Sequence, residues 1–398
     1  MAYMNERLFY VTAHFPYGRG ESFIGPEIID LKKRGIYLTV LPTYLKGEKY
    51  YSIEGIKSLK IPLFKFSFFI QFIWCLFKRP KAVFRTFRYI ATQPSKFYKN
   101  IPVVFKACFL VRSMSIRKED HIHAHWGSTS STMALAMAIL SGCRWSFTCH
   151  RWDIYENNLL ALKSSNAEFV RFISKKGLVD GLERGVQEGK AIWLPMGVKM
   201  PEGYSIRLYP QSNIVKLACI ANLVEVKGHI YLIEAIKHLK QKKIRCKLSV
   251  YGDGPLLQGL KKLARDLNVD ECITFYGHTQ HEIIHSELKS NIDIVVLPSI
   301  NTADGQHEGV PVCLMEAMSY GIPVISTKTG SIEELLEPKL GLTVPEKDSL
   351  ALAEKLEELI VDSERYESAS LLVSQLITEN WNVEKVTEQL DKKFFKRD

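Results

Sequence analysis

Residues 292–328 read IDIVVLPSINTADGQHEGVPVCLMEAMSYGIPVISTK. The apolar runs at its two ends, 292–299 and 322–328, are typical of buried strands, and Pro311 is a natural first residue of a helix between them. A strand, a helix and a second strand in this order predict a parallel β-α-β unit. In open sheets of this kind, ligands bind beyond the carboxyl ends of the strands, where residues 300–309 would lie.

The same alternation of apolar runs and helical stretches extends over most of the 398 residues. A β-α-β unit is predicted within residues 7–42, and further strands and helices fill the second half. We therefore predict an α/β fold with two doubly wound domains, residues 1–200 and 214–378, divided in the polar loop 201–213. Residues 379–398 are predicted to form a terminal helix that packs back on the N-terminal domain.

The composition is typical of a soluble globular protein, with 46% hydrophobic and 24% charged residues. None of the eight cysteines belongs to a CxxC pair or a zinc-ligand pattern, which favours a reducing cytosol. The first residues do not resemble a signal peptide. The longest apolar stretch, FSFFIQFIWCLF at 66–77, is interrupted by Gln71 and is too short to span a bilayer.

The net charge of +10 belongs to one region. Residues 55–118 contain fourteen Lys or Arg and no Asp or Glu, so the remaining residues together carry −4. Aromatic residues crowd the same region, whose helical spacing is interrupted by Pro62, Pro80, Pro94 and Pro102. An amphipathic surface on anionic lipid headgroups fits this mixture. A nucleic-acid surface and a helical insertion with core aromatics and solvated charges are the alternatives, and no nucleic-acid-binding motif is present.

Two glutamates in the quoted stretch point to a sugar nucleotide. Glu308 lies just ahead of the predicted helix, and Glu316 lies about one turn inside it, on the side that can face the same crevice. The helix N-terminus suits a phosphate, and the carboxylates can accept hydrogen bonds from a sugar and a ribose. The alternative is a surface loop with a helix-capping acid. At a similar corner, Lys227 and Gly228 sit where a helix begins, so Lys227 either neutralises a diphosphate or is a solvated lysine.

Five stretches in register resemble the family 4 retaining glycosyltransferases. They are HFPYGRGESFIGPEI (14–28), LVEVKG (223–228), VYGDGPLLQGL (250–260), FYGH (275–278) and the Glu-x7-Glu stretch EGVPVCLMEAM (308–318), which GIPVISTKTGSIEEL continues. The resemblance covers nearly the whole chain and implies the GT-B fold, with two Rossmann-like domains and a cleft between them. More narrowly, the sequence is similar to the bacterial branch that builds exopolysaccharide, capsule or lipopolysaccharide.

The resemblance also implies roles for individual residues. Glu308 would contact the donor sugar, Glu316 would hold the ribose, and Lys227 would bind the diphosphate. His150 would lie near the anomeric carbon and would be catalytic together with Glu308. Further implied donor contacts are Gly18, Gly20, Asn222, Gly309 and Val310, and implied acceptor or cleft residues are His125 and Asp153.

One departure from the family concerns the donor phosphate. Ala221 and Asn222 stand where the family usually has Gly-Arg. Asn222 can hydrogen-bond a phosphate but carries no charge. Either another cation such as Arg19 or Arg151 compensates, or the donor is held less strongly.

A metal site is considered for three alternating histidines, His121, His123 and His125, because a strand would place them on one face where they could bind zinc. The resemblance instead places this run at a strand end that points into the acceptor cleft. The chain lacks an Asp-x-Asp triplet for a metal–nucleotide complex, and GT-B enzymes usually stabilise the leaving diphosphate with Lys and helix dipoles. We expect no metal and no cofactor besides the nucleotide sugar.

These observations together predict a retaining, metal-independent hexosyltransferase. It would use a nucleotide-diphosphate sugar, with UDP the first choice, and a lipid-linked or core oligosaccharide acceptor of a cell-surface polysaccharide. We expect it in the cytoplasm, on the inner face of the cytoplasmic membrane, held through residues 55–118, with no nucleic-acid partner. The alternatives are a catalytically silent GT-B scaffold, a relative that isomerises nucleotide sugars, and a soluble glucan or sucrose-type synthase.

Overall fold

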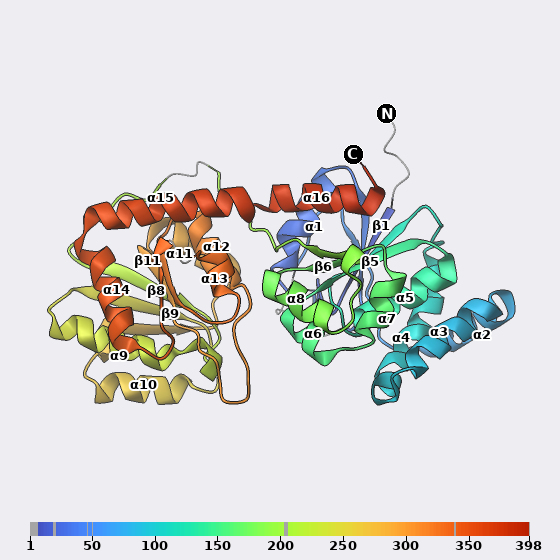
Figure 1. Cartoon of the computed structure of the whole chain (residues 1–398), viewed down its shortest axis with the longest axis horizontal. Helices are drawn as coiled ribbons and strands as arrows, with labels where there is room; N and C mark the ends of the chain where they lie inside the picture. The colour runs from blue at the N-terminus through green and yellow to red at the C-terminus, as the bar shows by residue number, and fades with distance from the viewer. Residues whose placement is uncertain are drawn as a thin grey trace. The chain divides into compact units, whose positions relative to one another are not determined.

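The computed structural model describes residues 7–18, 21–45, 47–49, 51–202, 206–337 and 340–397 (Figure 1). The chain divides into two compact units. Unit 1 comprises residues 1–197 and 383–398, and unit 2 comprises residues 198–382. The division between them lies just ahead of the loop 201–213, in which the sequence analysis placed it.

Unit 1 is built on a seven-stranded sheet in the order β3-β2-β1-β4-β5-β6-β7. Each pair of neighbouring strands is parallel, as expected for strands joined by helical crossovers. The strands are β1 (Arg7–Thr12), β2 (Tyr37–Pro42), β3 (Lys57–Ser58), β4 (His121–Ala124), β5 (Arg144–Cys149), β6 (Val170–Phe172) and β7 (Ala191–Trp193).

The helices of unit 1 include three that form the basic aromatic region. Pro80 and Pro94 each begin a helix, where a missing N–H costs nothing. Pro102 was expected to interrupt a helix, but it lies inside α4, which continues for 20 residues and packs against α5 and α2. The helices are α1 (Ile24–Lys33), α2 (Phe66–Lys78), α3 (Pro80–Ala91), α4 (Pro94–Ser113), α5 (Thr129–Ser141), α6 (Arg151–Glu156), α7 (Leu160–Asn166) and α8 (Lys175–Glu183).

The helix α16 (Val383–Phe395) completes unit 1 from the far end of the chain. It packs beside α1, as Figure 1 shows. The Thr387 hydroxyl donates to Asp30 on α1, and Arg34 donates to the carbonyl oxygen of Glu384 at 2.5 Å. The Phe394 ring is buried against the sheet. Residues separated by more than 350 positions therefore share one core.

Unit 2 contains a six-stranded parallel sheet in the order β10-β9-β8-β11-β12-β13. Its strands are β8 (Val215–Ile220), β9 (Cys246–Tyr251), β10 (Ile273–Gly277), β11 (Ile294–Leu297), β12 (Val324–Thr327) and β13 (Thr343–Val344). Its α-helices are α9 (His229–Gln241), α10 (Leu257–Asp266), α11 (His281–Ser290), α12 (Val312–Ser319), α13 (Ile332–Leu335), α14 (Ser349–Val361) and α15 (Ser363–Asn380). The predicted α/β class is confirmed in both units.

Among the residues that the structure describes, no helix combines the length and the apolar character that crossing a bilayer requires.

Candidate functional site

The predicted donor residues of unit 2 meet at the carboxyl ends of two neighbouring strands. Lys227 ends the short 3₁₀ helix η2 (Glu225–Lys227) that follows β8, and Glu308 lies in the loop after β11. The Lys227 ammonium donates a hydrogen bond to Glu308 Oε2. The Ser299 hydroxyl donates to the same carboxylate oxygen at 3.1 Å. The structure therefore brings together a cation and a carboxylate that are 81 positions apart.

Two glycines explain why these loops can approach so closely. Gly228 has φ +65°, and a Cβ atom added there would lie 1.9 Å from the carbonyl oxygen of Pro298. Gly330 has φ +58°, and its added Cβ would lie 1.9 Å from the carbonyl oxygen of Glu308. Only glycine fits a left-handed backbone in such contact with another backbone. Gly228 and Gly330 thus allow the loops that carry Lys227 and Glu308 to lie side by side.

The electrostatics of this corner keep Lys227 charged. Burial lowers the pKa of Lys227, but the neighbouring groups, with Glu308 first among them, raise it above its ordinary value. Cys313 on α12 is also close to these charges. Burial raises the pKa of its thiol to about 12. The Lys227 charge opposes this rise, and the charges of Glu308 and Glu316 support it. The Cys313 thiol therefore stays protonated and neutral near pH 7.

Glu316 is positioned by helix α11. Its Oε1 accepts a hydrogen bond from His281 Nε2–H at 2.8 Å, which raises the pKa of His281. The Glu316 side chain is 13% exposed and that of His281 is 36% exposed. Glu316 lies on the second turn of α12, as the sequence indicated, but its partner comes from a helix that the sequence analysis did not connect with it.

The remaining predicted donor residues of unit 2 lie in the same loops. The backbone N–H of Gly309 donates to Glu308 Oε1 at 3.2 Å, and Val310 packs against the core. Asn222 is exposed, two residues beyond the end of β8. An exposed, uncharged amide thus stands at this position.

The predicted catalytic residue of unit 1, His150, follows β5 and precedes the first turn of α6. Its ring packs on Trp126 with a centroid distance of 4.3 Å. Its backbone N–H donates to Asp153 Oδ2 at 2.9 Å, as part of a capping box. Burial raises the pKa of Asp153 to about 7. His150 is half-buried, whereas Asp153 is 1% exposed and lies behind it rather than at the surface.

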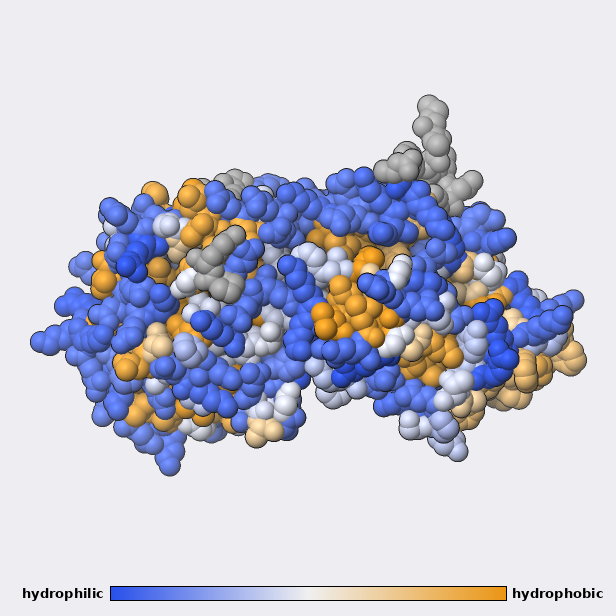
Figure 2. Space-filling view, in the orientation of Figure 1, coloured by the Kyte–Doolittle hydropathy of each residue, from blue (hydrophilic) through white to orange (hydrophobic). Residues whose placement is uncertain are grey.

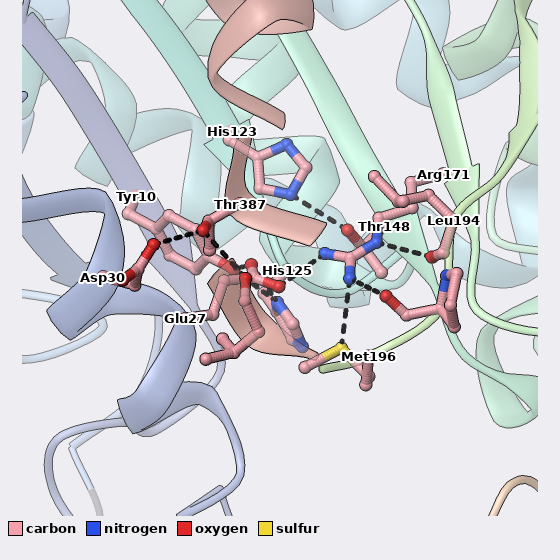
Figure 3. Close-up of polar contacts among 12 residues, drawn as sticks. Tyr10, Glu27, Asp30, His123, His125, Thr148, Arg171, Leu194, Met196 and Thr387 are labelled. Carbon is pink, nitrogen blue, oxygen red and sulfur yellow. Dashed lines mark hydrogen bonds and ion pairs between the residues drawn. The ribbon is translucent and has the colours of Figure 1, made fainter. Parts of the chain in front are cut away.

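A buried chain of hydrogen bonds ends at His150. Figure 3 shows Arg171, Glu27, Tyr10 and His125, the residues that lead to it. Arg171 Nη1 donates to Glu27 Oε2 at 2.7 Å, and the Tyr10 hydroxyl donates to Glu27 Oε1 at 2.5 Å. Because that hydroxyl has one proton, its oxygen accepts from His125 Nδ1–H at 2.6 Å. The Nε2 of His125 then accepts from His150 Nε2–H at 3.0 Å. One carboxylate therefore orders the protons along the whole chain.

The pKa shifts keep this chain in one protonation state near pH 7. Burial, followed by the Glu27 charge, raises the pKa of Tyr10 well above its usual value, so its hydroxyl keeps its proton. Burial and the Arg171 charge lower the pKa of His150 to about 3, and burial lowers that of His125 well below its ordinary value. Both imidazoles are therefore neutral, and His150 is a neutral donor with a fixed orientation.

The three alternating histidines are buried within unit 1 and do not form an exposed face. His121 and His123 belong to β4, are 0% exposed, and both contact the Ser146 hydroxyl at 2.8 Å. The Phe394 ring of α16 covers them, with centroid distances of 5.0 Å to each. His125 is also 0% exposed and contacts His150, and its assignment to the acceptor side stays a prediction.

The glycines of the first loop are only partly described. Gly18 has φ +80° and its N–H donates to the carbonyl oxygen of Glu48 at 3.3 Å. Gly20 lies outside the described residues, as does Arg19, one of the cations suggested to compensate for Asn222. The other, Arg151, lies on α6 in unit 1.

Sequence reasoning missed the ion pair of Glu27 and Arg171. Both side chains are essentially buried, with Glu27 1% and Arg171 0% exposed. A glutamate on the apolar face of α1 was the available signal, because a carboxylate enters a core only with a partner. Its partner on β6 is 144 positions away, which no local pattern could identify.

Comparison with known proteins identifies part of the chain. Residues 210–370 match the family model "Glycosyl transferases group 1". The colanic acid biosynthesis glycosyltransferase WcaL of Salmonella typhimurium is 35% identical over 198 residues, which are 49% of this chain and 48% of that protein. The amylovoran biosynthesis glycosyltransferase AmsK of Erwinia amylovora is 37% identical over 160 residues, which are 40% of this chain and 39% of that protein. The chain thus matches about half the length, or less, of these relatives.

Solved structures resemble the whole chain in fold. The crystal structure of Anabaena HepE in complex with UDP has a TM-score of 0.72 at 15% identity and covers 99% of this chain and 100% of its own. The lipopolysaccharide outer core galactosyltransferase WaaB has a TM-score of 0.68 at 15% identity, covering 98% and 99%. At such identities the likeness shows the fold, which is the GT-B arrangement of two Rossmann-like domains. Residues 210–370 are thus similar to glycosyl transferases group 1 and lie within a chain that has the GT-B fold.

Proposed function

We propose that the protein transfers a hexose from a nucleotide-diphosphate sugar, with UDP the first choice, to a lipid-linked or core oligosaccharide of a cell-surface polysaccharide. The observation that carries this proposal is the meeting of Lys227 and Glu308 at neighbouring strand ends inside the group 1 domain. An ammonium group there can neutralise a diphosphate, and a carboxylate can accept hydrogen bonds from sugar hydroxyls. The polysaccharide names of the relatives and the UDP bound to HepE point in the same direction.

The proposed reaction retains the anomeric configuration. The bond from the anomeric carbon to the diphosphate oxygen breaks, and the acceptor hydroxyl forms a new bond on the same face. The hydroxyl proton leaves with the diphosphate. Lys227 supplies the positive charge for the leaving group, so the proposal needs no metal cofactor. For Glu316 and His150 we propose the ribose contact and the position near the anomeric carbon that the family resemblance implies.

A melting experiment against UDP-, GDP- and ADP-sugars tests the donor site. A ligand present at 100 times its Kd stabilises the fold by about 2.7 kcal/mol. We expect one nucleotide sugar to raise the Tm of the wild type and to lose this effect in Glu316→Ala and in Lys227→Met. Glu354→Ala, which removes an exposed carboxylate on α14, is the matched control and should keep the full shift.

Other outcomes would favour the alternatives. If no donor shifts the Tm of the wild type, the catalytically silent scaffold gains support. Release of free UDP without any acceptor would indicate hydrolysis or isomerisation. Transfer to a soluble glucan or sugar phosphate would favour the soluble synthase.

We also propose that α2 and α3 hold the enzyme on an anionic membrane. Figure 2 shows apolar residues gathered at the end of unit 1 where α2 lies. Phe66 and Phe77 on α2 are 75% and 80% exposed, and Phe84 on α3 is 71% exposed. The exposed basic residues Lys78 and Arg79 directly follow Phe77 in the sequence. Lys106, in contrast, does not belong to this surface. It is 1% exposed and donates to backbone carbonyl oxygens, which makes it structural.

A further inference from the structure

Three polar side chains in unit 2 converge as metal ligands do. His281 and His285 lie one turn apart on α11, and Glu316 faces them from α12. Glu316 Oε1 is 2.8 Å from His281 Nε2 and 3.8 Å from His285 Nε2. The ligand atoms of all three residues lie within 4.8 Å of one another.

These distances lie on either side of the value for a tetrahedral zinc ion. Zinc binds imidazole nitrogen and carboxylate oxygen at about 2.0–2.2 Å, so tetrahedral ligand atoms lie about 3.3 Å apart. Residues 281–285 read HEIIH, and on a helix the spacing H-E-x-x-H places two imidazoles on one face. The sequence spacing and the third ligand from another helix are independent observations that indicate the same ion.

A further contact orients one of the ligands. His285 Nδ1 lies 2.9 Å from the Tyr320 hydroxyl. When Nδ1–H donates to that oxygen, the lone pair of His285 stays on Nε2, the atom on the side of Glu316. Such a partner behind a histidine fixes its tautomer and ring orientation in metal sites. At His281, zinc would replace the proton that now lies between Nε2 and Glu316.

We propose that His281, His285 and Glu316 bind one zinc ion, with water in the fourth position. Two imidazoles and one carboxylate are a donor set that suits zinc, and it leaves one position open. The site is inhibitory, because Glu316 cannot hold a ribose and a metal ion at once. This last step rests on the proposed function, whereas the metal site itself does not.

Zinc binding is measured first, on the full chain without nucleotide, by competition with a chromophoric chelator. We expect one zinc ion per chain and an affinity at least tenfold weaker in His281→Gln and in His285→Gln. Tyr320→Phe should weaken it by about 10–100-fold, as loss of an outer partner does. His238→Gln on α9 removes an imidazole outside the cluster and should leave the affinity unchanged. Circular dichroism checks that each variant is folded.

Cobalt gives a second readout of the same site. We expect Co²⁺ to show the intense visible absorption of a four-coordinate ion in the wild type and to lose it in both histidine variants. If the wild type binds zinc no more tightly than these folded variants, or if the cobalt spectrum does not change in them, the metal site is refuted.

The competition is measured separately, by donor-dependent melting with chelator and with saturating zinc. Loss of the donor shift in zinc, with its retention in His285→Gln, supports an inhibitory site. A donor shift that persists at saturating zinc overturns the inhibition but leaves the metal site standing. If zinc binds and no donor shifts the Tm in chelator, the proposed function fails and the metal site survives.

Discussion

At the scale of the residue, the pair Glu27 and Arg171 makes the sharpest prediction about stability. Arg171→Met leaves the Glu27 carboxylate buried without its cation. Breaking a buried ion pair from one side costs about 3–5 kcal/mol. We expect urea unfolding monitored by Trp fluorescence to show a loss of this size.

The double variant is the control for this interpretation. Glu27→Gln combined with Arg171→Met removes both charges, so it should recover part of the lost stability. If the stability lost in the double variant equals the sum of the losses in Glu27→Gln and Arg171→Met alone, the two charges do not interact.

The buried histidines predict how stability depends on pH. Burial lowers the pKa of His121 to about 3, whereas the unfolded chain has a pKa near 6.5. Between these values the unfolded state binds the proton and the folded state does not, so stability rises with pH and falls on acidification. The slope is about 1.4 kcal/mol per pH unit for one such histidine. His123, His125 and His150 act in the same direction.

Urea unfolding between pH 7.5 and pH 5 measures this slope. His121→Gln should make it shallower by the contribution of one histidine, while His278→Gln, which changes an exposed imidazole, should not alter it. Equal slopes in the wild type and His121→Gln would contradict the prediction.

Individual residues were predictable where the backbone alone decides their place. Lys227 and Glu308 each follow a strand in a parallel sheet, and strand ends share one edge, so their meeting follows from the fold. The burial of His125 and Asp153 could not be predicted, because it depends on side chains from several strands. The His281–Glu316 contact was missed because the two side chains come from helices 35 positions apart and meet only in the folded structure.

At the scale of the element, helix α16 is the part of unit 1 most open to test. Phe394 is 0% exposed and its ring lies 5.9 Å from that of Phe169. Removing a buried aromatic ring costs about 3–5 kcal/mol. We expect Phe394→Ala to lower the free energy of unfolding of unit 1 by this amount, measured by urea unfolding.

A neighbouring position provides the control. Lys393 lies on the exposed side of α16, so Lys393→Ala should change stability by less than about 0.5 kcal/mol. If the two variants unfold alike, α16 does not stabilise unit 1 through Phe394.

In unit 2, the observed helices begin close to the positions that the sequence predicted. Helices were expected to begin near Lys227 and Pro311, and they begin within two residues, at His229 and Val312. Strong apolar runs with Gly or Pro between them leave little ambiguity about where each strand and helix lies.

In unit 1, the short strands β3, β6 and β7 were not predicted. Two or three residues carry too little pattern, and these segments are strands only because they pair with neighbouring strands.

At the scale of the whole molecule, the basic aromatic helices predict binding to anionic vesicles. Changing Lys78, Arg79 and Lys81 to Glu replaces three positive charges near the exposed Phe77. Each basic residue near such a surface contributes about 1 kcal/mol. We expect cosedimentation with phosphatidylglycerol vesicles to be lost in this triple variant. Arg85 is left unchanged, since it donates to Asn166 at 2.8 Å.

A matched variant separates local charge from net charge. Changing the exposed Lys243, Lys262 and Lys289 of unit 2 to Glu alters the net charge equally and should leave vesicle binding intact. Phe77→Ser tests the apolar contribution and should weaken binding also at high salt. Full cosedimentation of the α2–α3 triple variant would refute the membrane surface.

The return of α16 to unit 1 also has a consequence for how the protein is made. A ribosome that has finished β7 has synthesised every strand of the first sheet, yet the side of β4 that Phe394 covers is still open. Translation of residues 198–382 comes in between and lasts on the order of ten seconds or more at about 5–20 residues per second. During that interval the apolar residues that share a core with α16, such as Leu8 and Phe169, are open to chaperones, and a premature stop codon ahead of α16 would leave them uncovered for good.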